Sequence, residues 1–257
     1  MSLKRGQISI FVLISLVILI GFSFVFYLNN PEEEKVQQKT SKELSASYDS
    51  IKLFVDLCLK DTAEKGIYAI GLQGGYYYND SLRQENPFIK IPYYWHEQKD
   101  LMPSIEVVQK QLAEYVESSF PKCINDFENL KTQGYEFKLG VIEASTIIGN
   151  YDVVVNIDYP IDASIGNEKI SLNKFSSKID FNFMEKYHFA RKIIDEQKKT
   201  PNSVPLSFIS RLAYDNNFTF GNTYMGNDLV LYTLVFEQQF KPAFVYNFVN
   251  SYNWAKQ

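Results

Sequence analysis

The stretch YDVVVNIDYPIDASIGNEKISLNKFSSKIDFNF, residues 151–183, alternates apolar and polar side chains in two runs. Residues 151–159 and 169–183 each place their apolar side chains on one side of a strand, as a period of two predicts. These apolar sets are Val153, Val155, Ile157 and Tyr159 in the first run and Ile179, Phe181 and Phe183 in the second. Gly166-Asn167 between the runs suits a tight turn that needs positive φ. The stretch therefore predicts an antiparallel hairpin with one buried face.

Strand-like alternation also occurs on both sides of this hairpin. The further segments that alternate are residues 135–147, 217–224, 229–236 and 243–249. Gly149-Asn150 and Gly226-Asn227 supply turn residues between neighbouring segments. We therefore expect a three-stranded antiparallel meander, followed later by a second hairpin and a last strand.

Helical periodicity marks four other segments. They are residues 48–70, 103–120, 183–199 and 206–213. Gly71 and Gly74 are expected to end the first helix, and Pro121 is expected to follow the end of the second. Pro87 and Pro92 break regular structure between these two helices, so a loop or a short edge strand is predicted there.

Strands that are grouped, rather than alternating with helices, predict an α+β fold with amphipathic helices packed on an antiparallel sheet. Three parts are expected: a cytoplasmic signal and transmembrane helix over 1–28, a polar helical stalk over 29–50, and an extracytoplasmic domain over 51–257. Thr200-Pro201 either divides this domain into two subdomains or lies within a single one.

The N-terminal segment has the length and charge of a membrane anchor. Ile8 to Leu28 is a run of 21 residues without a charge, and a helix of that length is about 30 Å long, enough to span the hydrocarbon core. Lys4 and Arg5 precede the run, so the positive-inside rule places the rest of the chain outside the cytoplasm. The alternative is a secretory signal peptide, but residues 27–30 offer no small-residue cleavage site.

Lys4-Arg5-Gly6-Gln7 before an apolar helix resembles the class III signal of archaeal type IV pilins and archaellins. The resemblance covers about the first 25 residues, and it implies that a prepilin-type signal peptidase cuts between Gly6 and Gln7 and leaves the helix in place. Many such pilins have Glu at the fifth mature position, where this chain has Phe11. That departure favours a minor surface component over a major filament subunit. An uncleaved signal anchor is the alternative.

Composition excludes several classes of function. Outside the first 28 residues the chain has 24 basic and 30 acidic side chains, so no basic face for nucleic acid is expected. Two His and two Cys are too few for a Cys-rich metal fold. We expect no cofactor, no metal and no enzymatic activity, because no motif for a catalytic nucleophile, a phosphate loop or a dinucleotide site is present. His96 and His188 are interpreted as structural or surface residues.

The two cysteines, Cys58 and Cys123, lie on or just after the first two helices of the predicted exterior domain. Because disulfides form in oxidising compartments, we expect a bridge that joins these helices. A loop of about 66 residues would contribute roughly 4 kcal/mol in the chain-entropy model. The alternative is two unconnected buried thiols.

A cluster of aromatic side chains is the most suggestive candidate for binding. It consists of Tyr76, Tyr77, Tyr78, Tyr93, Tyr94 and Trp95. Rings that face outward would stack on a sugar or hold a peptide, whereas rings that face inward would cover the helix pair. Asn79 and Asn217 match the glycosylation pattern. Asp152, Asp158 and Asp162 alternate along one strand, where either a cation or solvent would meet them.

The sequence thus supports a single-pass membrane protein with a pilin-like N-terminus and a structural or interaction domain outside the cell. The expected partners are membrane lipid, the signal peptidase, other copies of the chain, or a cell-surface protein or glycan. An anchored module that binds a glycan, peptide or protein is the second hypothesis, and an exported enzyme is the third.

Overall fold

A computed structural model describes residues 33–77, 83–85, 90–226 and 228–254. The predicted transmembrane segment, the Gly6–Gln7 cleavage site and Tyr78 and Asn79 lie outside the described residues. None of the helices within the described part is long and apolar enough to cross a membrane. The chain divides into two compact units, residues 1–50 and 51–257, and helix α2 (Glu33–Leu72) contributes to both. The following description concerns the unit 51–257.

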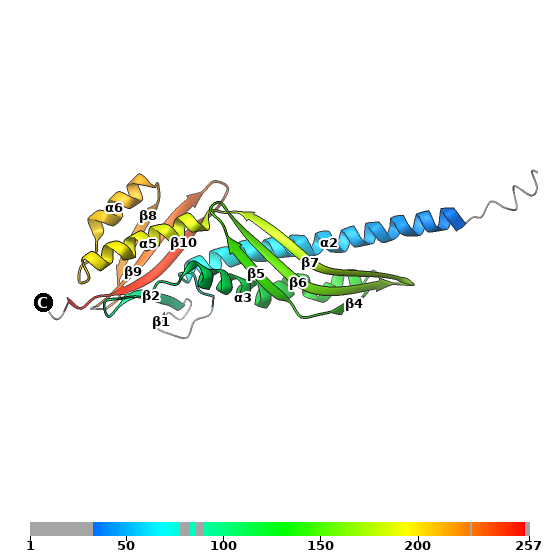
Figure 1. The fold of residues 1–257 in the computed structure, drawn as a ribbon, viewed down its shortest axis with the longest axis horizontal. Coiled ribbons are helices and arrows are strands. Elements are labelled where there is room, and N and C mark those ends of the chain that lie inside the picture. Colours follow the sequence, from blue (N-terminus) through cyan, green and yellow to red (C-terminus); the bar gives the residue numbers. More distant parts are fainter. Residues whose placement is uncertain (1–32, 78–82, 86–89, 227, 255–257) are drawn as a thin grey trace, which may run out of the picture. The chain divides into compact units, whose positions relative to one another are not determined.

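The predicted meander forms a four-stranded antiparallel sheet (Figure 1). Its strands are β4 (Glu136–Leu139), β5 (Glu143–Ile148), β6 (Asp152–Ile165) and β7 (Glu168–Asp180). Strand β7 pairs with one edge of β6, while β4 and β5 share the other edge. The single strand predicted over 135–147 is therefore wrong, since it is broken at Gly140. The break lies opposite a bulge in β6 at Pro160, which has no N–H to donate to a neighbouring strand. The Pro160 carbonyl accepts a hydrogen bond from the Gly140 N–H at 2.8 Å.

One face of this sheet is apolar, as the alternation predicted. Its buried side chains in β6 and β7 include Val153, Val155, Ile157, Ile161, Leu172, Phe175 and Ile179. Helix α3 (Ile105–Ile124) packs against β5, where Gln109 accepts the Ile148 N–H at 2.9 Å. The prediction that α3 ends before Pro121 is wrong. The helix passes through Pro121 and ends at Ile124. The next residue, Asn125, caps it with a left-handed backbone and donates its N–H to the Pro121 carbonyl. A 3₁₀ turn (Asn125–Phe127) and α4 (Glu128–Lys131) follow.

The remaining strands form a second, six-stranded sheet, whereas a single antiparallel sheet was expected. Its strands are β1 (Arg83–Glu85), β2 (Lys90–His96), β3 (Lys99–Asp100), β8 (Thr219–Tyr224), β9 (Leu229–Gln238) and β10 (Lys241–Ser251). The order is β1-β2-β10-β9-β8, with β3 beside β2. The predicted loop or edge strand is instead internal and runs parallel to β10, so the sheet is mixed. This is possible because Pro92 faces the short β1, while Tyr93 and Trp95 pair with β10.

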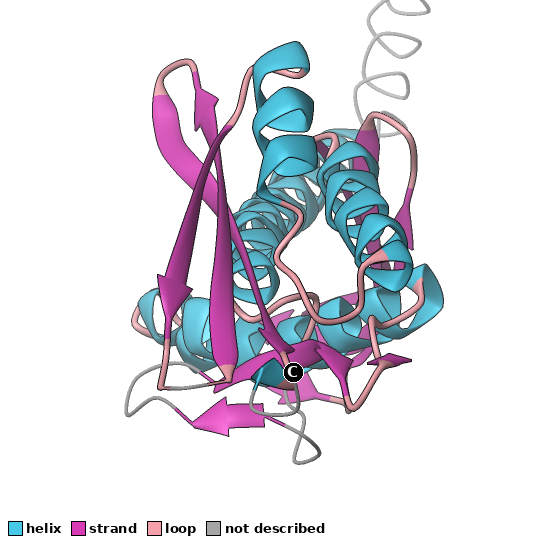
Figure 2. Cartoon of the chain, turned by 90° about the vertical axis from the view of Figure 1, so that its left-hand side faces the viewer, coloured by secondary structure: helices cyan, strands magenta, loops and turns pink. Residues whose placement is uncertain are grey.

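Helices α5 (Phe183–Lys199) and α6 (Leu206–Asp215) lie beside the six-stranded sheet (Figure 1), and Figure 2 shows helices and strands as neighbouring layers. Rings of α5 and the sheet pack together, with Phe189 against Phe236 and Phe183 against Phe244, each pair 5.9 Å between centroids. The strand predicted as far as Phe183 ends earlier, at Asp180. Asn182 caps α5 instead, because its side chain accepts the Glu185 N–H at 3.0 Å.

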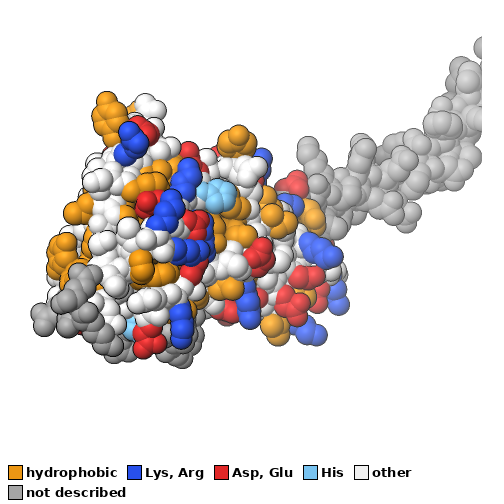
Figure 3. Space-filling model, turned by 60° about the vertical axis from the view of Figure 1, so that its left-hand side comes forward, with side chains coloured by type: hydrophobic (Ala, Val, Ile, Leu, Met, Phe, Trp, Pro, Cys, Tyr) orange, Lys and Arg blue, Asp and Glu red, His pale blue; other side chains and the backbone are white. Residues whose placement is uncertain are grey.

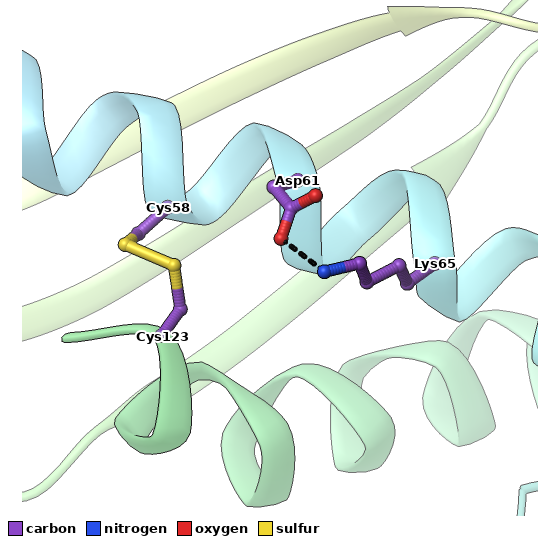
Figure 4. Close-up of a disulfide and its surroundings, with 4 residues drawn as sticks. All are labelled: Cys58, Asp61, Lys65 and Cys123. Carbon is purple, nitrogen blue, oxygen red and sulfur yellow. Dashed lines mark hydrogen bonds and ion pairs between the residues drawn. A yellow bond between two sulfur atoms is a disulfide. The ribbon is translucent and has the colours of Figure 1, made fainter. Parts of the chain in front are cut away.

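A disulfide joins α2 to α3 (Figure 4). Cys58 and Cys123 have Cα atoms 5.6 Å apart and are separated by 65 residues in sequence. The C-terminal end of α2 lies against β10 and requires glycine there. A Cβ on Gly71 would meet the Phe244 ring at 2.5 Å, and Gly74 has a φ of +56° with the Asn247 carbonyl 2.6 Å from the position of a Cβ. Helix α2 is therefore held in two places, by the disulfide to α3 and by the close packing of its C-terminal end on β10.

Candidate functional site

A pocket of about 680 Å³ lies at one end of the six-stranded sheet. Four segments form its wall: the turn between β2 and β3, the loop after α5, the turn between β8 and β9, and the end of β10. They contribute Trp95, His96, Glu97, Gln98, Pro201, Asn202, Met225, Asp228, Leu229, Ser251, Tyr252 and Asn253. Sequence analysis missed this pocket as a whole because its residues come from segments that are far apart in the chain.

The turn between β2 and β3 presents two polar side chains at the pocket. Glu97 and Gln98 have φ values of 50° and 59°, a left-handed conformation that suits a two-residue hairpin turn but is uncommon for residues other than glycine. His96 comes directly before them, and its Nδ1 lies 2.8 Å from the Ser251 hydroxyl on β10. The strained turn is therefore tied to the neighbouring strand at the point where the pocket begins.

Three side chains hold the loop after α5 in place. Gln197 donates from Nε2 to the carbonyls of Thr200, at 2.7 Å, and Ser203, at 3.0 Å. The Trp95 and Trp254 indoles donate to the next two carbonyls, those of Pro201 and Asn202, at 3.3 and 3.0 Å. Because these bonds satisfy the loop's backbone from several sides, the wall of the pocket is preorganised.

A buried polar network lies behind this loop. The Tyr252 hydroxyl donates to Gln197 Oε1 at 2.5 Å and also contacts the Tyr232 hydroxyl. Asn250, fully buried, donates to the same Gln197 oxygen at 3.4 Å. Burial raises the pKa of Tyr252 to about 12 and raises the pKa of Tyr232 further, so both phenols are neutral at physiological pH.

The predicted aromatic cluster does not form one outward surface. Tyr94 and Trp95 are 0% and 4% exposed, so of the two alternatives these rings follow the inward one. The Tyr94 hydroxyl donates to the Gly74 carbonyl at 2.9 Å and lies 2.7 Å from the Tyr246 hydroxyl, and its burial raises its pKa well above the usual value. Tyr94 therefore joins α2 to the sheet from inside the core.

The other tyrosines of the cluster that the structure describes are half-buried and lie in different surroundings. Tyr77 packs edge-on against Tyr115 of α3, with the ring centroids 5.1 Å apart, and its N–H donates to Gln111 at 2.9 Å. Tyr93 packs against the His96 ring at 4.8 Å. Tyr76 is also half-buried. Of the described members of the predicted cluster, only Trp95 lines the pocket.

The remaining candidate residues are dispersed. Asp152 pairs with Lys178 at 2.8 Å and Asp162 accepts from Ser171 at 2.6 Å, while Asp158 is exposed. Within the described ranges no group of three or more possible metal ligands occurs. Asn217 is exposed at the turn before β8, so its glycosylation stays a prediction. On the face shown in Figure 3, charged side chains of both signs are interspersed with apolar ones.

The contact between His96 and Ser251 joins a base and a hydroxyl, which is part of what nucleophilic catalysis needs. Such a pair also needs a third group that orients the imidazole, and no carboxylate among the described residues bonds to His96. No protein-family model matches the chain, and no curated protein or solved structure matches it either.

Proposed function

We propose that this chain is a single-pass, membrane-anchored protein whose unit 51–257 lies outside the cytoplasm and serves a structural or interaction role. The observation that carries the proposal is the Cys58–Cys123 bridge in a chain that also has a charge-free apolar run from Ile8 to Leu28. Stable disulfides belong to oxidising compartments, and the apolar run supplies the route there.

The N-terminal residues add an orientation and a processing step to this proposal. Lys4 and Arg5 keep the N-terminus in the cytoplasm, and cleavage after Gly6 by a prepilin-type signal peptidase would leave Ile8 to Leu28 in the membrane. Helix α2 begins at Glu33, a few residues after this run. The mature protein would then be a minor pilin-like surface component.

N-terminal sequencing of the membrane fraction from an archaeal expression host tests the processing step. We expect a mature chain that starts at Gln7, and a Gly6→Val variant that is not cut. Ser2→Ala is the matched control, because it alters the same short segment but leaves Gly6 and Gln7 in place. A wild-type chain that still starts at Met1 or Ser2 would contradict the pilin-like signal, and a chain found in the soluble fraction would contradict the anchor.

An anchored module that binds a ligand is a second candidate function, and the pocket at the end of the six-stranded sheet favours it. A volume of about 680 Å³ is within the usual range for ligand sites, and the wall combines apolar and polar side chains on a preorganised backbone. Isothermal titration of the full chain in detergent with oligosaccharides and with short peptides tests this function. Asn253→Trp should fill the open side and abolish binding, and equal binding by this variant would exclude the pocket.

A further inference from the structure

The pocket at the end of the six-stranded sheet has an uneven distribution of charge. Glu97 and Asp228, both exposed, bring carboxylates from two different turns, and no Lys or Arg belongs to the lining. Neither carboxylate forms an ion pair within the part of the chain that the structure describes. The site therefore offers negative charge that the described residues leave uncompensated.

The turns that carry Glu97 and Asp228 are held by their backbone, not by hydrogen bonds of the two carboxylates. Glu97 stands in a left-handed turn, with a φ of 50°. The turn that carries Asp228 is closed by main-chain bonds, from the Tyr252 N–H to the Asp228 carbonyl at 2.7 Å and from the Met225 N–H to the Leu229 carbonyl at 2.8 Å. Because main-chain groups make these bonds, the two side chains remain available to a ligand.

The rest of the wall complements a ligand with an alkyl part and hydrogen-bond donors. Met225 and Leu229 are half-buried and offer hydrocarbon surface beside Asp228. Asn202 also lines the pocket, and its buried Oδ1 has no hydrogen-bond partner among the described residues. Methylene groups along the apolar residues and a positive head at the carboxylates would satisfy both parts of the wall.

We propose that this pocket binds a protonated amine carried on an alkyl chain. Two sources present this chemistry: the lysine side chain of a peptide and a free polyamine. The inference rests on the second candidate function above, because it names the ligand class of that same pocket. Neutral sugars would need hydrogen-bonding groups but would leave the charge of Glu97 and Asp228 uncompensated.

Titration calorimetry of the full chain in a neutral detergent at low salt tests the proposal. The probes are spermidine, the peptide acetyl-Lys-Gly-Lys-amide and the same peptide with both lysines acetylated. We expect the amines to bind and the acetylated peptide not to bind. The Glu97→Gln/Asp228→Asn variant should weaken binding by roughly tenfold, since each rim carboxylate contributes a few-fold. Added salt should weaken binding as well.

Glu168→Gln is the matched control, because Glu168 is a half-buried carboxylate beside the tight turn between β6 and β7 and does not line the pocket. Thermal melts confirm that each variant is folded. Tighter binding of the peptide or of spermidine identifies the source of the amine. Absence of binding by both amines, or equal affinity of the double variant and the control, overturns the proposal. Binding of a neutral oligosaccharide alone would keep the pocket as a site but overturn the amine assignment, and the membrane anchor would be unaffected.

Discussion

The two sheets of the unit 51–257 are stabilised in different ways. The four-stranded sheet has one apolar face packed against α3, and α3 is joined to α2 by the disulfide. The six-stranded sheet has a core in which hydroxyl and amide groups of Tyr94, Tyr246 and Gln197 are buried and bonded. Apolar packing is tolerant of change, whereas a buried polar network costs stability whenever one member is lost. The pocket lies where the second kind of core reaches the surface.

Removal of the disulfide should have the largest effect on the four-stranded side. A Cys58→Ala/Cys123→Ala variant is expected to lose about 4 kcal/mol of unfolding free energy, because the unfolded chain regains the entropy of a long loop. Denaturant unfolding measures this loss, and reduced wild type serves as the control. Hydrogen exchange should show that α3 loses protection before β9. Unchanged stability after reduction would mean that apolar packing alone holds α2 on α3.

Loss of the glutamine in the polar network should have the next largest effect. Gln197→Ala leaves the Tyr252 hydroxyl and the carbonyls of Thr200 and Ser203 without their partner, so we expect a loss of about 3 kcal/mol. Gln109→Ala on the other sheet is the comparison. Gln109 is half-buried and water can replace it at the Ile148 N–H, so its loss should be about 1 kcal/mol. Equal losses in urea unfolding would remove the distinction between the two sheets.

The hydroxyl of Tyr94 should contribute less than Gln197, because its removal leaves fewer groups without a partner. Tyr94→Phe is expected to cost about 1.5 kcal/mol, since the Gly74 carbonyl and the Tyr246 hydroxyl each lose a bond in the core. Tyr159→Phe on β6 keeps the edge-on contact with Phe120 and should cost less than about 0.5 kcal/mol. Thermal unfolding of both variants checks this order, and a larger loss for Tyr159→Phe would reverse it.

The smallest expected effect concerns Asp100 and depends on pH. Burial alone would raise the pKa of Asp100, but hydrogen bonds from Lys198 and the Met102 N–H and the charge of Arg191 outweigh burial and lower it. A lowered folded pKa adds stability above the unfolded value of about 4, and this stability is lost as pH falls through the folded pKa. Asp100→Asn should therefore cost about 1 kcal/mol at neutral pH and nothing in strong acid.

Chemical unfolding of wild type and Asp100→Asn between neutral and strongly acidic pH measures this difference. Asp152→Asn on the four-stranded sheet is the control, because its partner Lys178 keeps 62% of its side-chain surface exposed and no measurable loss is expected. A cost of Asp100→Asn that persists in strong acid would show that its contacts act through packing and not through charge.

The sequence predicted the four-stranded sheet better than the six-stranded one for a physical reason. Strands β6 and β7 are neighbours in the chain, and one face of each is exposed to solvent. The alternation of apolar and polar residues and a tight turn were therefore sufficient to predict their pairing. Strand β2 contains Pro92 and pairs with β10, more than 150 residues away, and no local pattern records that pairing. Burial of Tyr94 depends on the same long-range contact, so the sequence left open whether its ring faces inward or outward.

The pocket could not be predicted from the sequence for a related reason. Its two carboxylates belong to turns whose local sequences are ordinary, and they come together only when β2 and the β8–β9 hairpin join the same sheet. The contact of His96 with Ser251 on β10 likewise required the parallel pairing of these strands. A long-range pairing of strands is therefore what the local patterns lacked.

Cysteine labelling in intact cells tests the proposed placement of the chain most directly. Lys174→Cys on the exposed side of β7 and Ser2→Cys at the N-terminus each add one thiol to a chain whose native cysteines are bridged. A membrane-impermeant maleimide should label Lys174→Cys in intact cells. Ser2→Cys is combined with Gly6→Val, which prevents cleavage and so retains the N-terminus, and this variant should be labelled only after lysis. Labelling of Lys174→Cys only after lysis would contradict an anchored protein with its folded unit outside the cytoplasm.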